Sequence, residues 1–208
     1  MDFDPRAYWE QRSAERRQTG VVVSESYAVI SGPPPYSTPN FRDRAHQREW
    51  IMQQVARFGW RSVLDAGCGV GLWFYLWNEL GMEAAGVDQA PSAIEWAKET
   101  SADIGAPFSA SVARLDRLPF EDRSFDVAVT SKVLLHTVPE EIEPALAELG
   151  RVARHLLLLE MRKHDKPLNQ HVFPHDYLGL ADRLGFEVLV SEMFPGDHHY
   201  LVLRSPEC

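Results

Sequence analysis

The stretch Val63-Leu-Asp-Ala-Gly67-Cys-Gly69-Val-Gly71 decides the fold of this sequence. Apolar residues before it predict a short buried strand, and the apolar run after it predicts a helix. Glycines between a strand and a helix let the backbone turn sharply and let a ligand come close to it. The next predicted strand ends in Asp88, 21 residues after Gly67. This combination predicts nucleotide binding, although such a turn can bind nothing and Asp88 could merely cap a helix.

The same alternation of strands and helices continues along the chain. The predicted strands are residues 61–65, 83–88, 107–112, 125–130, 155–161, 186–194 and 199–204, and the predicted helices are 46–58, 72–80, 91–100, one after a capping box over 137–140, and 174–184. Alternating strands and helices favour a parallel sheet, but the last two strands are joined too closely for a helical crossover. We therefore expect an α/β fold, a three-layer doubly wound sheet with one antiparallel strand near its end.

The N-terminal residues 1–45 differ from the rest of the chain. Their prolines exclude one long helix, although a short helix around residues 8–17 is expected. The segment is too short to bury a core of its own. We expect an arm or lid over residues 1–45 and a single domain over residues 46–208. The arm's aromatic residues either close over a site or anchor the arm to the domain.

Composition narrows the possible partners. The chain has 21 Lys and Arg against 30 Asp and Glu, a net charge of -9, which disfavours a nucleic-acid partner. Its two cysteines form no CxxC pair, so a disulfide framework or zinc site is not expected. The N-terminus lacks a secretory signal, and no run of about 18 apolar residues could span a membrane. We expect a cytoplasmic monomer or homodimer that acts on a small molecule.

The glycine spacing and one carboxylate indicate which nucleotide is bound. A dinucleotide fingerprint has its third glycine one residue later than Gly71, and a phosphate-binding P-loop would need a following Gly-Lys-Ser/Thr. Asp65, at the end of the first predicted strand, would repel pyrophosphate but suits a cation. S-adenosylmethionine carries an ammonium and a sulfonium, so it is favoured over a nicotinamide dinucleotide.

At this point the sequence resembles the class I S-adenosylmethionine-dependent methyltransferases, particularly those acting on small molecules and lipids. The resemblance rests on residues 63–71, on Gly86-Val-Asp88 and on residues 118–139, and it covers most of residues 46–204. It implies seven strands in the order 3-2-1-4-5-7-6, with strand seven antiparallel. It also implies that the glycine loop contacts the methionine portion, Asp88 the ribose and residues 114–116 the adenine.

Two positions depart from the family pattern. Many relatives have an acid where this chain has Arg114, while Asp116 follows two residues later. The usual Pro-Gly-Gly turn before strand five is replaced by residues 151–155. The predicted cofactor-binding residues are Asp65, Gly67, Cys68, Gly69, Gly71, Asp88, Gln89, Arg114, Leu115 and Ser131.

Methyl transfer requires an acceptor held about 3–3.5 Å from the methyl carbon and, for some acceptors, a general base. The candidate bases or acceptor contacts are His136, Glu160 and His171. The candidate acceptor-binding residues are Tyr27, Tyr36, Lys132, His136, His164 and His175. The alternative for His136 is a packing role that shapes its loop. No metal is expected, because Pro174 interrupts the one His-x-x-x-His pair in this region.

The sequence thus predicts an enzyme that transfers a methyl group from S-adenosylmethionine to an O, N or C atom of a metabolite or natural-product intermediate. A nicotinamide-dependent oxidoreductase and a non-catalytic cofactor-binding subunit are the alternatives. Binding of the cofactor without an acceptor pocket would favour the non-catalytic alternative.

Overall fold

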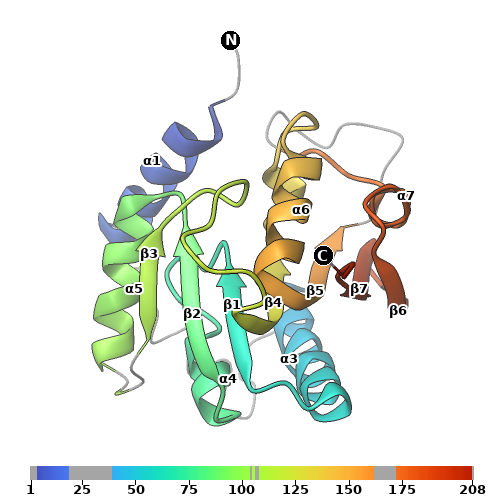
Figure 1. Cartoon of the computed structure of the whole chain (residues 1–208). Helices are drawn as coiled ribbons and strands as arrows, with labels where there is room; N and C mark the ends of the chain where they lie inside the picture. The colour runs from blue at the N-terminus through green and yellow to red at the C-terminus, as the bar shows by residue number, and fades with distance from the viewer. Residues whose placement is uncertain (1–3, 19–38, 104, 106–107, 162–171, 208) are drawn as a thin grey trace.

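A seven-stranded sheet in the order β3-β2-β1-β4-β5-β7-β6 forms the centre of the computed structural model (Figure 1). The structure describes residues 4–18, 39–103, 105, 108–161 and 172–207. The strands are β1 (Ser62–Ala66), β2 (Glu83–Asp88), β3 (Ser109–Val112), β4 (Phe125–Ser131), β5 (Ala153–Met161), β6 (Glu187–Phe194) and β7 (His198–Arg204). Strand β7 is antiparallel to β5 and β6, and all other neighbours are parallel. The predicted fold class, strand order and antiparallel strand are confirmed.

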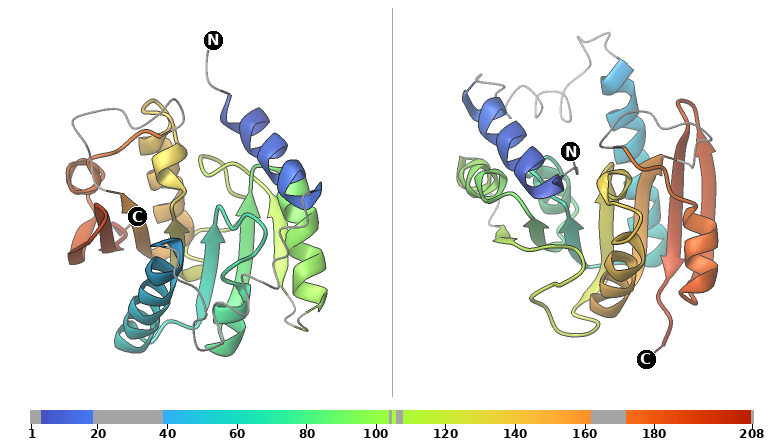
Figure 2. Two further views of the ribbon diagram at one scale, coloured as in Figure 1. Left: turned by 180° about the vertical axis from the view of Figure 1, so that it is seen from behind. Right: turned by 90° about the horizontal axis from the view of Figure 1, so that it is seen from above.

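Helices cover both faces of this sheet (Figure 2). The helices are α1 (Pro5–Gln18), α3 (Pro39–Phe58), α4 (Phe74–Glu79), α5 (Pro91–Asp103), the 3-10 turn η1 (Leu134–His136), α6 (Ile142–Val152) and α7 (Tyr177–Arg183). Alternate strand residues face opposite cores, so Val63 packs with α3, α4 and α5 while Leu64 packs with α6 and α7. None of the helices in the described part of the chain has both the length and the apolar character to cross a bilayer.

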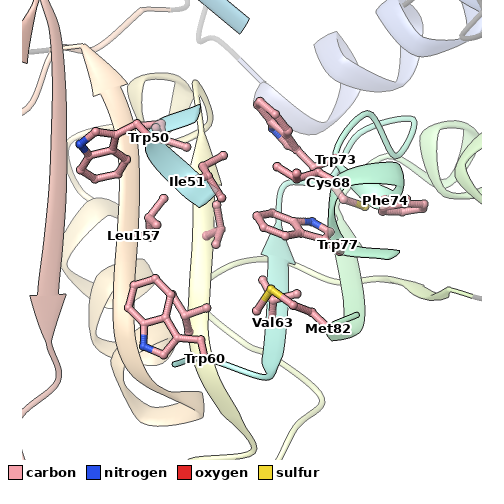
Figure 3. Packing of buried hydrophobic residues seen from close by; sticks show 14 of the residues in the cluster. Trp50, Ile51, Trp60, Val63, Cys68, Trp73, Phe74, Trp77, Met82 and Leu157 are labelled. Atoms are coloured by element: carbon pink, nitrogen blue, oxygen red, sulfur yellow. The ribbon is translucent and has the colours of Figure 1, made fainter. Parts of the chain in front are cut away.

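The core beside α3 and α4 contains several large aromatic side chains among its aliphatic residues (Figure 3). Trp50 of α3 and Trp77 of α4 are almost fully buried, and Trp77 donates its indole N–H to Asp65 Oδ2 at 3.1 Å. Trp60, before β1, donates to His155 Nδ1 at 3.2 Å. This packing holds β1 firmly and leaves the glycine loop at its carboxyl end.

Several element ends differ from the prediction. Helix α3 begins at Pro39 and therefore crosses the predicted boundary at residue 45. Helix α4 begins later than residue 72, because Gly71 (φ +82°) and the residues after it are still in the turn. The predicted capping box is wrong: α6 is capped by Glu141 without a side-chain bond, because a turn separates Thr137 from the helix. Helix α7 begins at Tyr177, where Asp176 accepts from the Gly179 amide.

Candidate active site

The carboxyl ends of β1, β2, β3 and β4 border a cavity of about 450 Å³. Helices α1 and α3 also contribute to its walls. Nine of the ten predicted cofactor-binding residues line it: Asp65, Gly67, Cys68, Gly69, Asp88, Gln89, Arg114, Leu115 and Ser131. The tenth, Gly71, supports the turn instead, since a Cβ there would lie 2.5 Å from the Phe74 ring.

Two glycines of the loop after β1 serve different purposes. Gly67 has φ +78°, and a Cβ on it would lie 2.5 Å from Cγ1 of Val133, so only glycine fits between these segments. Gly69 has φ +54° but faces open space. The amides of Gly67 and Cys68 both donate to the Val87 carbonyl, at 2.8 and 2.9 Å. The loop is therefore tied to β2 and leaves room beside Gly69.

Asp88, at the end of β2, is held by main-chain amides on both of its oxygens. Oδ2 accepts from Gly69 N at 3.0 Å and Oδ1 accepts from Ala90 N at 2.9 Å. Burial raises the pKa of Asp88, with the bonds from Ala90 and Gly69 opposing it and the charge of Glu10 adding to it. Each oxygen keeps a lone pair that can accept from a ligand hydroxyl. Asp88 thus both caps the following turn and faces the cavity.

A second buried carboxylate, Asp65, is influenced by the charge of Asp88. Burial raises the pKa of Asp65 to about 7; the bond from Trp77 lowers it and the charge of Asp88 raises it further. The pKa of the Cys68 thiol is raised well above 9.0 by burial and by both carboxylates, so this thiol stays neutral and is a poor nucleophile. The inner end of the cavity is therefore acidic, and a positively charged ligand group would restore the ionised carboxylates.

Arg114 connects two walls of the cavity. Arg114 forms a bidentate ion pair with Asp116, in which Nε donates to Oδ1 at 3.0 Å and Nη2 donates to Oδ2 at 2.9 Å. Nη2 of Arg114 also lies 2.8 Å from Glu141 Oε1. These contacts join the segment after β3 to the start of α6. The departure from the family pattern thus has a structural reason, because Arg114 holds the nearby carboxylates in place.

The segment after β4 brings the first candidate base into the cavity. Lys132 adopts φ +57°, and its amide donates to the Leu159 carbonyl at 3.0 Å. His136 lines the cavity, and its ring lies edge-on to Trp9 of α1 with centroids 4.6 Å apart. Lys132 and His136 therefore both line the cavity, and their contact with an acceptor stays a prediction.

Two other predicted acceptor contacts lie behind this segment and do not line the cavity. Glu160 is fully buried, and its Oε1 accepts from Val133 N at 3.1 Å and Leu134 N at 3.2 Å. His175 is also buried and lies with Nε2 2.9 Å from the Thr137 carbonyl, to which it donates. Both residues hold the main chain of the wall. This placement favours a structural role over the base or acceptor contact that we predicted.

Some predicted residues cannot be placed, and others were missed. The residues Tyr27, Tyr36, His164 and His171 lie outside the described residues. The cavity is also lined by Trp9 and Ser13 of α1, by Gln47 of α3 and by Trp73, which is also part of the buried core. Gln47 is only 2% exposed, and its Nε2 has no hydrogen-bond partner in the described structure. A polar residue on the apolar face of α3 was the sequence signal for it.

Helix α1 is fastened across the cavity at the start of α5. Glu10 Oε2 accepts from Ser92 N at 3.2 Å, while Trp9 and Ser13 face the cavity. Figure 2 shows α1 beside α5, above the carboxyl edge of the sheet. Within the described ranges, no three His, Cys, Asp or Glu side chains are grouped as a metal site.

Comparison with known proteins shows similarity to methyltransferases. Residues 63–155 match a family model described as a methyltransferase domain. The uncharacterized methyltransferase YodH of Bacillus subtilis (strain 168) is 31% identical over 104 residues, covering 50% of this chain and 43% of YodH. The malonyl-[acyl-carrier protein] O-methyltransferase of Serratia marcescens is 30% identical over 93 residues, covering 45% and 34%. The chain thus spans less than half the length of these two curated relatives.

A solved structure shows the same fold over nearly the whole chain. The crystal structure of magnesium protoporphyrin IX methyltransferase (ChlM) from Synechocystis PCC 6803, with bound SAH, superposes with a TM-score of 0.68. The two proteins are 17% identical, and the superposition covers 94% of this chain and 100% of the other.

Proposed function

We propose that this chain is a class I S-adenosylmethionine-dependent methyltransferase, as the match of residues 63–155 to a methyltransferase domain indicates, and that it methylates a small molecule. The cavity at the carboxyl edge of the sheet is the proposed site for both the methyl donor and the acceptor. The observation that carries the proposal is the pair of buried carboxylates, Asp65 and Asp88, beside the glycine loop.

The chemistry of the cavity fits S-adenosylmethionine. Its ammonium and sulfonium are cations, and a cation would stabilise the acidic inner end, where burial and the charge of Asp88 raise the pKa of Asp65. A pyrophosphate would meet the same two carboxylates and be repelled. The space beside Gly69 lets a ligand approach the backbone closely.

Individual residues then take distinct binding roles. The free lone pairs of Asp88 accept from the ribose hydroxyls, and the segment 113–116 forms the adenine side of the cavity. Gln47 offers a buried, unused N–H group, which suits a carboxylate or carbonyl oxygen of a bound molecule. The residues therefore supply acceptors where the ligand donates and a donor where it accepts.

Bound S-adenosylmethionine supplies a methyl group already activated by a positively charged sulfur. The protein must hold the acceptor in line and keep water away. Trp9 and Trp73 offer flat apolar walls, and His136 is the group we assign to take a proton from the acceptor. The cavity volume of about 450 Å³ and the net charge of -9 favour a small metabolite or natural-product intermediate over a nucleic acid.

Calorimetry with S-adenosylhomocysteine and NADH tests the cofactor. We expect micromolar binding of S-adenosylhomocysteine, no binding of NADH, and roughly tenfold weaker binding in Asp88→Asn, which loses a charged acceptor. Asp126→Asn is the matched control, since Asp126 accepts from Arg61 N and Ser62 N at the opposite edge of the sheet. Binding of NADH alone would overturn the proposal, and binding of neither would favour a non-catalytic role.

The protonation of Asp65 provides a second test. Its pKa of about 7 means that much of it is protonated at pH 6.5, and a bound ammonium favours the ionised form. S-adenosylhomocysteine binding should therefore release a proton and become tighter as the pH rises from 6 to 8. Calorimetry in buffers of different ionisation enthalpy measures this release, which Asp65→Asn should abolish. Once binding is established, release of S-adenosylhomocysteine from candidate acceptors identifies the substrate.

A further inference from the structure

The wall of the cavity formed by residues 131–137 is held from behind through its main chain. Three successive amides, those of Val133, Leu134 and Leu135, donate to the side chain of Glu160 at 3.1, 3.2 and 3.4 Å. The Leu135 carbonyl accepts from Phe173 N at 2.7 Å. The segment thus has many main-chain contacts on the side away from the cavity.

These amides need an acceptor because they lie in a turn. Leu134 and Leu135 are buried, and a buried N–H group without a partner destabilises the conformation that contains it. Glu160 is fully buried at the end of β5 and reaches all three amides with its two oxygens. Such bonds are stronger when the acceptor is ionised. The position of this wall therefore depends on the charge of one side chain.

We propose that Glu160 is a positioning residue whose negative charge fixes the cavity wall carrying Val133 and His136, and that neutralising Glu160 loosens this wall. The Val133 side chain lies against Gly67, and the His136 ring packs against Trp9. Gly67 and Trp9 both line the cavity, so a shift of this wall would change the shape of the cavity. The significance of the wall for methyl transfer rests on the proposed function. The contact between Glu160 and the three amides is independent of the proposed function.

The groups that face Glu160 leave its charge uncompensated. Tyr177 of α7 lies on its side of the sheet, and burial together with the charge of Glu160 raises the pKa of this phenol well above 10.0. His199 of β7 is the residue paired with Glu160 of β5 in the antiparallel ladder, and burial lowers the pKa of His199. Thr130 of β4 lies near enough to lower the pKa of Glu160, and its own hydroxyl does not titrate. Among the described residues, no ion pair involves Glu160.

The loosening should therefore occur near neutral pH. Burial raises the pKa of Glu160 to about 7, against the lowering effect of the bonds from Val133 and Leu134. Above this pH both oxygens accept from the three amides. Below it one oxygen carries a proton, and that hydroxyl either faces an N–H donor or turns away from it. At least one of the three contacts is then weakened.

Nuclear magnetic resonance of the ligand-free protein tests the contact directly. The amide signals of Val133, Leu134 and Leu135 should shift together with a midpoint near pH 7, and Glu160→Gln should abolish this common titration. At pH 8 the variant should exchange these amide hydrogens roughly tenfold faster, because a neutral acceptor replaces a charged one. In Asp126→Asn, which loses a carboxylate at the opposite edge, residues 133–135 should behave as in the natural protein.

The Trp9 indole signal, assigned with Trp9→Phe, reports whether the effect reaches the cavity. It should differ between the natural protein and Glu160→Gln at pH 8 and converge at pH 5.5, where Glu160 is protonated. Amides that do not titrate, or an indole signal unaffected by the variant, would overturn the proposal. Should Glu160→Gln fail to fold, the titration of the natural protein decides alone. These signals are measured on the ligand-free protein and do not depend on S-adenosylhomocysteine. If S-adenosylhomocysteine failed to bind, the proposed function would be refuted, but the test of Glu160 would still stand.

Discussion

At the residue scale, the cavity contains a few buried polar side chains that destabilise the folded protein but are suited to binding a ligand. Within the part of the chain that the structure describes, Asp65 and Asp88 are buried carboxylates that accept from neutral donors, and Gln47 Nε2 is a buried donor without an acceptor. Such groups destabilise a ligand-free protein, since burial of a charge or of an unpaired donor costs free energy. In a binding site, this loss of free energy in the ligand-free protein is offset when the ligand supplies the missing partner.

Gly67 allows the steric and conformational demands of the loop to be separated. Gly67→Ala adds a Cβ 2.5 Å from Val133 at φ +78°, whereas Gly81→Ala has φ +65° and open space. We expect Gly81→Ala to lose roughly 1–2 kcal/mol of unfolding free energy through backbone strain. Gly67→Ala should lose roughly 1–3 kcal/mol more through overpacking and bind no S-adenosylhomocysteine. Urea denaturation and calorimetry measure both; equal losses in the two variants would contradict the steric explanation.

Gln47 offers a test in which stability and binding change in opposite directions. Gln47→Met keeps the length of the side chain and removes the unpaired donor, so the ligand-free protein should gain roughly 1 kcal/mol. Binding in the cavity should weaken. Gln54→Met is the matched control, because Gln54 is also buried on α3 with an unpaired oxygen but does not line the cavity. It should stabilise the protein without changing the affinity for S-adenosylhomocysteine.

At the element scale, helix α1 covers the cavity through few described contacts. Its attachment includes the bond from Ser92 N to Glu10, and Trp9 touches the wall at His136. A carboxylate near the start of a helix is also stabilised by the helix dipole. Movement of α1 away from α5 would expose the cavity while leaving the sheet intact. Ligand entry and release are therefore expected to depend on this helix.

Removing the attachment of α1 should change rates more than affinity. In Glu10→Ala the loss of a carboxylate at the start of α5 should speed both association and dissociation of S-adenosylhomocysteine by roughly two- to fivefold. Stopped-flow tryptophan fluorescence measures both rates. Glu10→Gln retains an acceptor oxygen, so its association and dissociation rates should lie between those of the natural protein and those of Glu10→Ala. A change confined to dissociation would indicate a direct contact of Glu10 with the ligand instead.

At the scale of the whole molecule, buried histidines and buried acids give stability opposite pH dependences. Burial lowers the pKa of His155, His175 and His199, so their contribution is present above pH 6.5 and is lost as the pH falls. Burial raises the pKa of Asp65 and Glu160 to about 7, so their contribution is present below their ordinary values of 3.8 and 4.5 and is lost as the pH rises towards 7. The two sets oppose each other between about pH 5 and 7.

Removing both acids should reveal the contribution of the histidines. The double variant Asp65→Asn and Glu160→Gln should gain unfolding free energy from pH 5 to pH 7 more steeply than the natural protein. Urea denaturation at several pH values measures the two slopes. Equal slopes would show that these carboxyl groups do not have raised pKa values in the folded protein.

Local rules were enough for the fold class and for the glycine loop with its acid, while the strand order and the adenine segment came from the family resemblance. Strand and helix periodicity, the glycine loop and the acid at Asp88 all act over short stretches of chain, and the parallel pairing of β1 to β4 then places their carboxyl ends at one edge. This is why nine predicted cofactor residues line one cavity. Element ends were less accurate: Thr137 matched a capping motif, yet the turn before α6 leaves no room for it.

Only tertiary structure decided which polar residues face the cavity and which support it. Glu160 and His136 both follow buried strands, and sequence alone gave no reason to separate them. The register of β5 against β7 and the packing of α7 bury Glu160 beneath the main chain, while the segment after β4 brings His136 against Trp9. Gln47 reaches the cavity because α3 packs across the sheet. These contacts join residues far apart in the chain, so periodicity and spacing carry no information about them.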